Sequence, residues 1–226
     1  MNVTKDKISS VFFQYSIPSV LGMLAISSAN IVDGFFVGNY VGDFGLAAIN
    51  ISLPIFSLLF GFALMLAIGG SVIAGKLIGE EDIKNASIIF TKTIVCITFF
   101  SFIACSLLFI NIETVLYLFG ADENLIKIAI EYLSVIVIFI PFLMIGVVLD
   151  YFVRVDNRPN LAFIALLSSA VINVILDWFL IVYLQKGIFG AALATGISQL
   201  ALIFILLPHF FSKKATLKFV KPIGSY

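Results

Sequence analysis

The sequence predicts an all-α, polytopic membrane protein with six transmembrane helices. Of its 226 residues, 62% are hydrophobic and 12% are charged, whereas soluble domains average about 45–50% apolar and about 25% charged residues. A helix needs about 20 apolar residues to cross a bilayer, and six apolar stretches of this kind are separated by polar segments. We therefore expect one six-helix transmembrane unit over residues 1–226, with spans at about 11–37, 46–76, 86–110, 128–153, 161–183 and 188–211.

Prolines mark points at which individual spans can bend. The first span is longer than the about 7–15 apolar residues of a signal peptide, so we interpret it as a retained helix, and Pro18 lies near its start. The second span holds Pro54 and Gly61, which predict a kink. The fourth span contains Pro141, and the loop before it is expected to form a short interfacial helix at about residues 114–119.

The basic residues predict the orientation, because cytoplasmic loops carry an excess of lysine and arginine. An even number of spans places both termini on one side. That side carries eleven of the thirteen basic residues: Lys5, Lys7, Lys76, Lys84, Lys92, Arg154, Arg158, Lys213, Lys214, Lys218 and Lys221. We expect a multi-pass protein of the cell membrane with both termini in the cytoplasm. The formal net charge is zero, which gives no indication of a nucleic-acid partner.

Acidic residues inside apolar spans are the candidate functional residues. An ionised Asp at the centre of a membrane helix costs about 2.5–3.5 kcal/mol, and less toward the ends. Asp33 lies in the outer half of the first span and Asp177 in the outer half of the fifth. Asn173 shares a helical face with Asp177 because it lies four residues earlier, and Thr195 lies in the outer half of the sixth span. These four side chains can therefore meet at one depth.

This set offers oxygen ligands and titratable carboxylates. Two acids in one site can share a proton, and Asp33, Asn173 and Asp177 can instead coordinate Na⁺. No cofactor other than this coupling ion is expected. In the alternative, structural interpretation, Asp177 and Asn173 form hydrogen bonds between helices and Asp33 lies at the wet end of its span. Thr195 would then be one of the threonines that are common at helix contacts.

Two polar groups near the cytoplasmic side have a structural interpretation. Asp150 precedes Arg154 by four residues, which is the favourable order for an ion pair on a helix. His209 lies at the inner end of the sixth span, and we expect it at the membrane interface.

The segment GSVIAGK at residues 70–76 matches the first part of a phosphate-binding loop. However, Leu77 stands where Ser or Thr is needed, and the segment continues an apolar helix instead of following a strand. We interpret its glycines and their neighbours as sites of close helix approach. These glycines are Gly69, Gly70, Gly75 and Gly79.

Several short motifs occur in an ordered series along the whole chain. They are Ile17-Pro18, VDGFFVG at 32–38, LAAINISLP at 46–54, Gly69-Gly70-Ser71 with Gly75-Lys76 and Gly79, and Phe152-Val153-Arg154 before Asn157-Arg158-Pro159. Together they resemble the N-terminal lobe of the MATE (multidrug and toxic compound extrusion) family of efflux transporters. The resemblance implies a six-helix lobe with an acidic pocket formed by Asp33, Asn173, Asp177 and Thr195, and a first helix that bends at Pro18.

The resemblance also implies a function. Members of this family are antiporters, not enzymes, and export small organic, often cationic, compounds in exchange for H⁺ or Na⁺. Their transporters have two such lobes with the substrate cavity between them. The expected partners are therefore an organic substrate, the lipid bilayer and a second six-helix lobe, which is either a C-terminal half or a second copy. The abrupt tail favours a fragment of a longer transporter.

Three alternative functions make different demands on the sequence. A flippase for a lipid-linked polysaccharide, from the same superfamily, often lines its cavity with basic residues, and no Lys or Arg lies in the middle of a span here. An intramembrane aspartyl hydrolase usually carries a Gly-x-Gly-Asp motif, which the sequence lacks. A non-transporting structural subunit is the third alternative.

Overall fold

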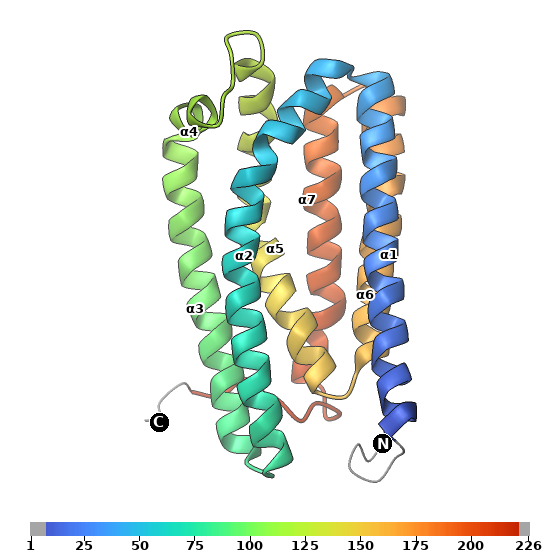
Figure 1. The fold of residues 1–226 in the computed structure, drawn as a ribbon, viewed down its shortest axis with the longest axis vertical. Coiled ribbons are helices and arrows are strands. Elements are labelled where there is room, and N and C mark those ends of the chain that lie inside the picture. Colours follow the sequence, from blue (N-terminus) through green and yellow to red (C-terminus); the bar gives the residue numbers. More distant parts are fainter. Residues whose placement is uncertain (1–7, 222–226) are drawn as a thin grey trace.

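A computed structural model describes residues 8–221, and this part of the chain consists of helices and connecting loops without a strand (Figure 1). Six stretches are long and apolar enough to cross a membrane, which confirms the predicted all-α fold with six spans. The long helices are α1 (Ile8–Tyr40), α2 (Asp43–Gly79), α3 (Ile83–Ile110), α5 (Ile126–Val155), α6 (Pro159–Asp177) and α7 (Gly187–Leu206). Lys5 and Lys7 lie outside the described residues.

Three short helices complete the described chain. The helix α4 (Ile112–Leu118) lies between α3 and α5, where a short interfacial helix was expected. A π-helix, η1 (Trp178–Tyr183), follows α6 directly, and a 3₁₀ helix, η2 (Leu207–Phe211), follows α7. Residues 212–221 then run along the end of the bundle without regular structure, and we call this segment the strap.

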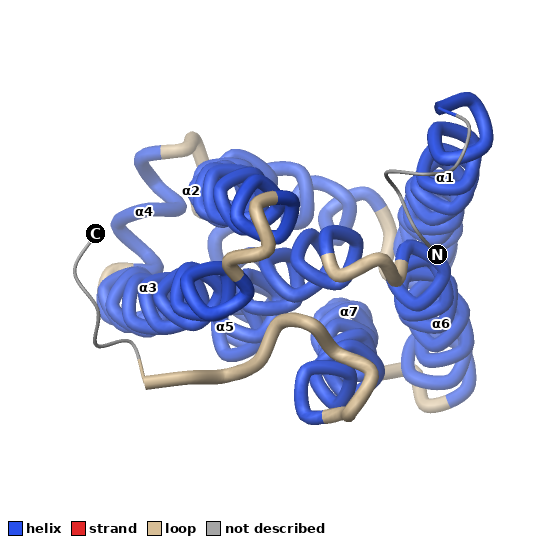
Figure 2. Tube along the Cα trace, turned by 90° about the horizontal axis from the view of Figure 1, so that it is seen from below, coloured by secondary structure: helices blue, strands red, loops and turns tan. Residues whose placement is uncertain are grey.

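The long helices run alternately up and down, so the described chain begins and ends at the same end of the bundle (Figure 1). We call this the lower end and the opposite one the upper end, as drawn there. The helices α5 and α7 pack against each other in the middle. On one side α2 and α3 cover α5, and on the other α6 packs against α7 (Figure 2). The helix α1 packs mainly on α6 and is otherwise peripheral.

The prolines act differently in α1 and α2. The helix α1 continues through Pro18, and the Ser19 hydroxyl donates a hydrogen bond to the Tyr15 carbonyl oxygen at 2.7 Å in the turn that the proline weakens. The upper part of α2, which holds Pro54, leans relative to its lower part (Figure 1), in agreement with the predicted kink.

Glycines allow two helix pairs to approach closely. A Cβ atom at Gly22 in α1 would lie 2.8 Å from Leu166 Cδ1 in α6, and one at Gly196 in α7 would overlap the Phe139 ring in α5. Small residues at such points let helix backbones approach in a membrane. The close contacts between α1 and α6 and between α5 and α7 therefore depend on these glycines.

The prediction for the four glycines of α2 is confirmed in part. Gly70 lies against α3 and α5, since a Cβ there would be 2.5 Å from Thr93 Oγ1 and 3.1 Å from Phe152 Cζ. At Gly75 a Cβ would make only an ordinary contact, and at Gly69 and Gly79 it would meet nothing within 4 Å. The prediction is wrong for these last two, because they lie on exposed parts of the helix surface.

Replacement of Gly196 by alanine should lower the free energy of unfolding by about 1–3 kcal/mol, the usual cost of overpacking. The added methyl group would displace the Phe139 ring and separate α5 from α7. Thermal unfolding in detergent measures this effect. The matched control is Gly61→Ala in α2, where nothing lies within 4 Å of the new atom. Equal midpoints for the two variants would contradict the proposed packing role.

The predicted ion pair between Asp150 and Arg154 is confirmed. The guanidinium donates two hydrogen bonds of 3.0 Å, from Nε and Nη2, to the two carboxylate oxygens. It also donates to Ser19 Oγ in α1, and the Tyr15 hydroxyl donates to Asn157 Oδ1 at 2.6 Å. These contacts hold the lower part of α1 against the turn between α5 and α6.

A buried carboxylate fixes the strap to the lower end. Asp156 is 3% exposed and accepts hydrogen bonds from His209 Nε2 at 2.6 Å and from the backbone N–H groups of Thr216 and Leu217 at 3.0 and 3.3 Å. The side chain of His209, which we expect at the membrane interface, is buried within the protein at the lower end, and its depth in the membrane stays a prediction. The strap crosses the lower end below α7 and α5 toward α3 (Figure 2), and the His209 side chain is 8% exposed.

Candidate cation-binding site

Asp33 and Asp177 meet near the upper end of the bundle. Asp33 lies in the upper part of α1, and Asp177 is the last residue of α6. Because α1 packs along α6, the two carboxyl groups come within hydrogen-bonding reach of each other. Asp177 is completely buried and Asp33 is half-buried.

The two carboxyl groups lack donors. Asp33 Oδ1 and both carboxyl oxygens of Asp177 are buried and accept no hydrogen bond within the described part of the chain. Ionised carboxylates are acceptors only, so the close approach becomes a hydrogen bond only when a proton lies between them. A buried acceptor without a partner costs about 1–3 kcal/mol, and more when charged. A shared proton or another cation between the two carboxyl groups would supply the missing partner.

Tyr132 is a third polar side chain near this pair. It comes from α5, is 5% exposed and lies close enough to Asp33 and Asp177 for their charges to act on its hydroxyl group. Sequence reasoning missed it, because a tyrosine in an apolar span is equally typical of the interfacial belt. The signal that could have identified Tyr132 is its depth, since it lies in the outer half of the fourth predicted span, as the two acids do in theirs.

The other two predicted site residues lie on neighbouring turns. Asn173 is 8% exposed and one turn below Asp177 on the same face of α6. Thr195 is half-buried in α7, and its carbonyl oxygen accepts a hydrogen bond from Ser198 Oγ at 2.7 Å. Within the described residues neither side chain forms a hydrogen bond with the two acids, so their part in the site stays a prediction.

Pro18 is remote from the carboxyl pair. It lies 15 residues before Asp33 in α1, which at about 1.5 Å per residue is about 22 Å along the helix. It therefore cannot touch a cation held by the acids. Its predicted role in bending α1 remains a prediction and would act through the helix as a whole.

The backbone changes its geometry at the site. The helix α6 ends at Asp177 and continues as the π-helix η1. Such segments are rare and frequently occur at functional sites. A π-helix has about one more residue per turn than an α-helix, so the positions that face the bundle change immediately after the buried acid. In η1, Ile181 is buried while Trp178 and Tyr183 are exposed. The sequence carries no proline or glycine that signals this change.

The oxygen ligands available at the site are suited to a small monovalent cation. The described residues include no group of three or more His, Cys, Asp or Glu side chains that could hold a metal ion. The ligands near this site are the carboxyl groups of Asp33 and Asp177 and the hydroxyl group of Tyr132. One cation of charge +1 between Asp33 and Asp177 removes their mutual repulsion, which at about 4 Å is worth about 4 kcal/mol for an effective dielectric constant of about 20.

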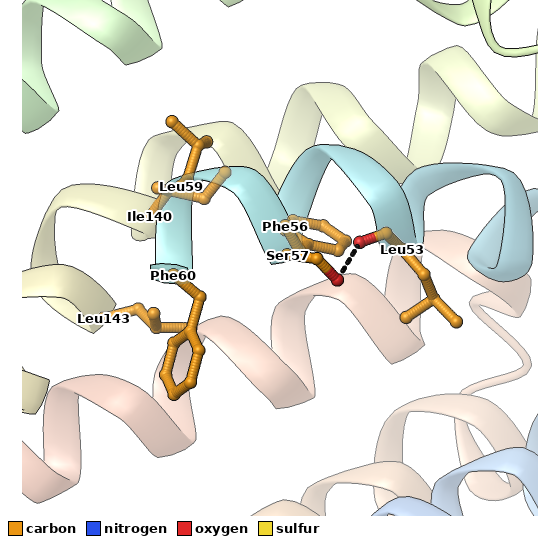
Figure 3. Close-up of a pocket in the computed structure, with 7 residues that line it drawn as sticks. All are labelled: Leu53, Phe56, Ser57, Leu59, Phe60, Ile140 and Leu143. Carbon is orange, nitrogen blue, oxygen red and sulfur yellow. Dashed lines mark hydrogen bonds between the residues drawn. The ribbon is translucent and has the colours of Figure 1, made fainter. Parts of the chain in front are cut away.

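An apolar cavity of about 190 Å³ lies between α2 and α5 (Figure 3). Its lining residues are Leu53, Phe56, Ser57, Leu59, Phe60, Ile140 and Leu143. The Phe56 ring packs edge-to-face on Tyr132, with ring centroids 6.3 Å apart. Because Tyr132 also lies beside the two acids, these two aromatic residues connect the cavity to the carboxyl pair.

Comparisons with known proteins agree with this architecture. The model of the MatE family matches residues 18–179, more than half of the chain. The chain is 29% identical over 222 residues to the "Multidrug export protein MepA" of Staphylococcus saprophyticus, covering 95% of this chain and 49% of that protein. It is 28% identical over 215 residues to the protein of the same name from Staphylococcus haemolyticus, covering 95% and 48%.

Solved structures show the same fold. An outward-facing multidrug resistance transporter of the MATE family and MOP superfamily matches with a TM-score of 0.85 and 25% identity over 91% of this chain and 46% of that one. A structure of MATE in the straight conformation matches in fold with a TM-score of 0.85 and 24% identity, over 92% and 46%. The chain spans about half the length of the curated relatives it matches.

Proposed function

This chain belongs to the MatE family, and from that premise we propose that it is one half of an antiporter. The antiporter exports small organic, often cationic, compounds in exchange for H⁺ or Na⁺. The second six-helix lobe comes from the remainder of a longer protein or from a second copy. In this proposal the lower end faces the cytoplasm, and the excess of lysine and arginine at that end supports this orientation.

The observation that carries this proposal is the buried carboxyl pair without donors. When a cation lies between Asp33 and Asp177, the upper ends of α1 and α6 stay together. When the cation leaves, the two like charges repel. The helix α1 packs mainly on α6, so it can respond while the rest of the bundle stays in place. Coupling requires only that cation and substrate favour different arrangements of the lobe.

The apolar cavity supports an organic substrate. It offers phenyl and leucyl side chains from α2 and α5 with one hydroxyl group, that of Ser57. Binding pockets for small molecules typically combine such apolar walls with a few polar groups. Phe56 and Tyr132 link this cavity to the acids. A movement of Tyr132 on cation binding is therefore transmitted through its contact with the Phe56 ring to a substrate in the cavity.

Transport in proteoliposomes tests the proposal. The chain is reconstituted alone and together with a second six-helix lobe, and ethidium movement is followed under a proton gradient and, separately, a sodium gradient. We expect one gradient to drive ethidium, and Asp33→Asn to slow it about tenfold or more. The matched control is Glu131→Gln, an exposed acid on α5 beside Tyr132, which should stay within about twofold.

Two results contradict the proposal. One is wild-type protein that moves no ethidium under either gradient even with the second lobe supplied. The other is an Asp33→Asn variant that transports as well as Glu131→Gln does. The gradient that drives ethidium identifies the coupling ion.

A further inference from the structure

A second cavity, of about 240 Å³, opens at the lower end. It is lined by Phe210, Phe211, Ser212, Lys213, Lys218 and Phe219. The last apolar stretch able to cross the membrane ends at Phe211, and the strap begins directly after it. The cavity therefore lies at the level of the membrane surface, where lipid headgroups are found.

Aromatic stacking gives the cavity fixed walls. Phe210 is 1% exposed and stacks on Phe90 of α3 with ring centroids 4.4 Å apart. Phe219 contacts Phe90 at 4.8 Å and stacks on Phe211 at 5.3 Å. One aromatic cluster around Phe90 of α3 therefore holds η2 and the strap together.

Backbone hydrogen bonds hold the strap side of the cavity. The N–H of Lys218 donates to Ser87 Oγ at 3.3 Å, and the N–H of Val220 donates to Thr91 Oγ1 at 3.1 Å. Both acceptors belong to α3. The Lys218 side chain therefore starts from an anchored backbone, and a ligand in the cavity does not have to order a loose segment on binding.

The lining of the cavity combines basic and apolar side chains. Lys213 and Lys218 are exposed and form no ion pair with any residue that the structure describes. The strap carries four lysines and no acid. Asp156, to which the strap is bound, is buried and already accepts hydrogen bonds from His209 and the strap backbone. Phe211, which is 71% exposed, adds an accessible phenyl ring to this lining.

We propose that this cavity binds the phosphate headgroup of an anionic phospholipid. The ammonium groups of Lys213 and Lys218 contact the phosphate, and Phe211 contacts the upper part of an acyl chain. Basic pockets next to transmembrane helices are suited to anionic headgroups. A free phosphate ion is also an anion but makes no use of the exposed phenyl ring, so the lipid is the ligand that uses the whole cavity.

Native mass spectrometry of the full chain in a non-ionic detergent tests this site. The protein is titrated with phosphatidylglycerol and, in parallel, phosphatidylcholine. The variant Lys213→Gln/Lys218→Gln should bind phosphatidylglycerol about tenfold more weakly. The matched control is Lys214→Gln/Lys221→Gln, which removes the same charge from exposed positions of the strap outside the lining. It should stay within about twofold of wild type.

Three outcomes overturn the proposal. If both double variants bind phosphatidylglycerol equally weakly, the lysines attract the lipid by their charge alone and there is no defined binding site. Equal affinity for the two lipids means that the headgroup charge is not recognised. Displacement of phosphatidylglycerol by inorganic phosphate at a similar concentration means that the cavity holds a free anion. Circular dichroism checks that each variant is folded, as expected for replacements of exposed side chains.

Discussion

A cation at 100 times its dissociation constant is expected to raise the free energy of unfolding of the wild-type chain by about 2.7 kcal/mol. The cation is Na⁺, or H⁺ supplied by lowering the pH. Asp177→Asn should lose this gain. The reason is that the folded chain alone brings Asp177 and Asp33 together. Na⁺, or H⁺ at a pH above about 4 where the aspartates of the unfolded chain stay ionised, therefore stabilises the folded state selectively.

The sole tryptophan, Trp178, follows Asp177 directly and its fluorescence reports both unfolding and changes at the site. Thermal unfolding is measured in detergent over a range of Na⁺ concentrations and, separately, of pH. The Glu131→Gln control should keep the full cation effect, since Glu131 is exposed. An Asp177→Asn variant that is stabilised by the cation as strongly as wild type would disprove the assignment of the site.

Replacement of Asp156 by alanine is expected to lower the free energy of unfolding by about 3 kcal/mol or more. The change leaves three donors without their acceptor: His209 Nε2 and the N–H groups of Thr216 and Leu217. Two of these donors belong to the strap itself, and the third, on His209, is buried. The strap should therefore detach as well, and trypsin should then cleave the freed backbone next to its lysines.

Asp122→Ala is the matched control for this carboxylate. Asp122 also accepts two backbone hydrogen bonds, from Asn124 and Leu125, but it is exposed, so its loss should cost only about 1 kcal/mol. Thermal unfolding and limited trypsin digestion of both variants give the comparison. A cost no larger for Asp156→Ala than for Asp122→Ala would show that the strap does not depend on this carboxylate.

Much of the fold could be predicted from the sequence because the membrane restricts the choices. A backbone in hydrocarbon must satisfy its own hydrogen bonds, so each long apolar stretch is a helix. An acid in such a stretch is conspicuous, and counting spans gives its depth. Asp33 and Asp177 were predicted to meet on this basis, and the structure brings them within hydrogen-bonding reach.

The remaining features depend on which helices are neighbours, which hydropathy does not report. Tyr132 belongs to the site because α5 lies in the middle of the bundle. The sequence does not indicate that Asp156 and His209 are partners, because their contact depends on the strap folding back over the lower end. In the same way Gly70 contacts α3 and α5 while Gly69 faces away, because only one side of α2 packs against them.

The double-mutant cycle of Asp33→Asn and Asp177→Asn on cation-dependent stabilisation tests most directly whether the two acids share one cation. Residues that act as a unit give non-additive effects. If the cation is shared, each single variant loses the whole stabilisation and the double variant loses no more. If each single variant keeps about half of it and the losses add up in the double variant, the acids act as separate sites and the shared cation is contradicted.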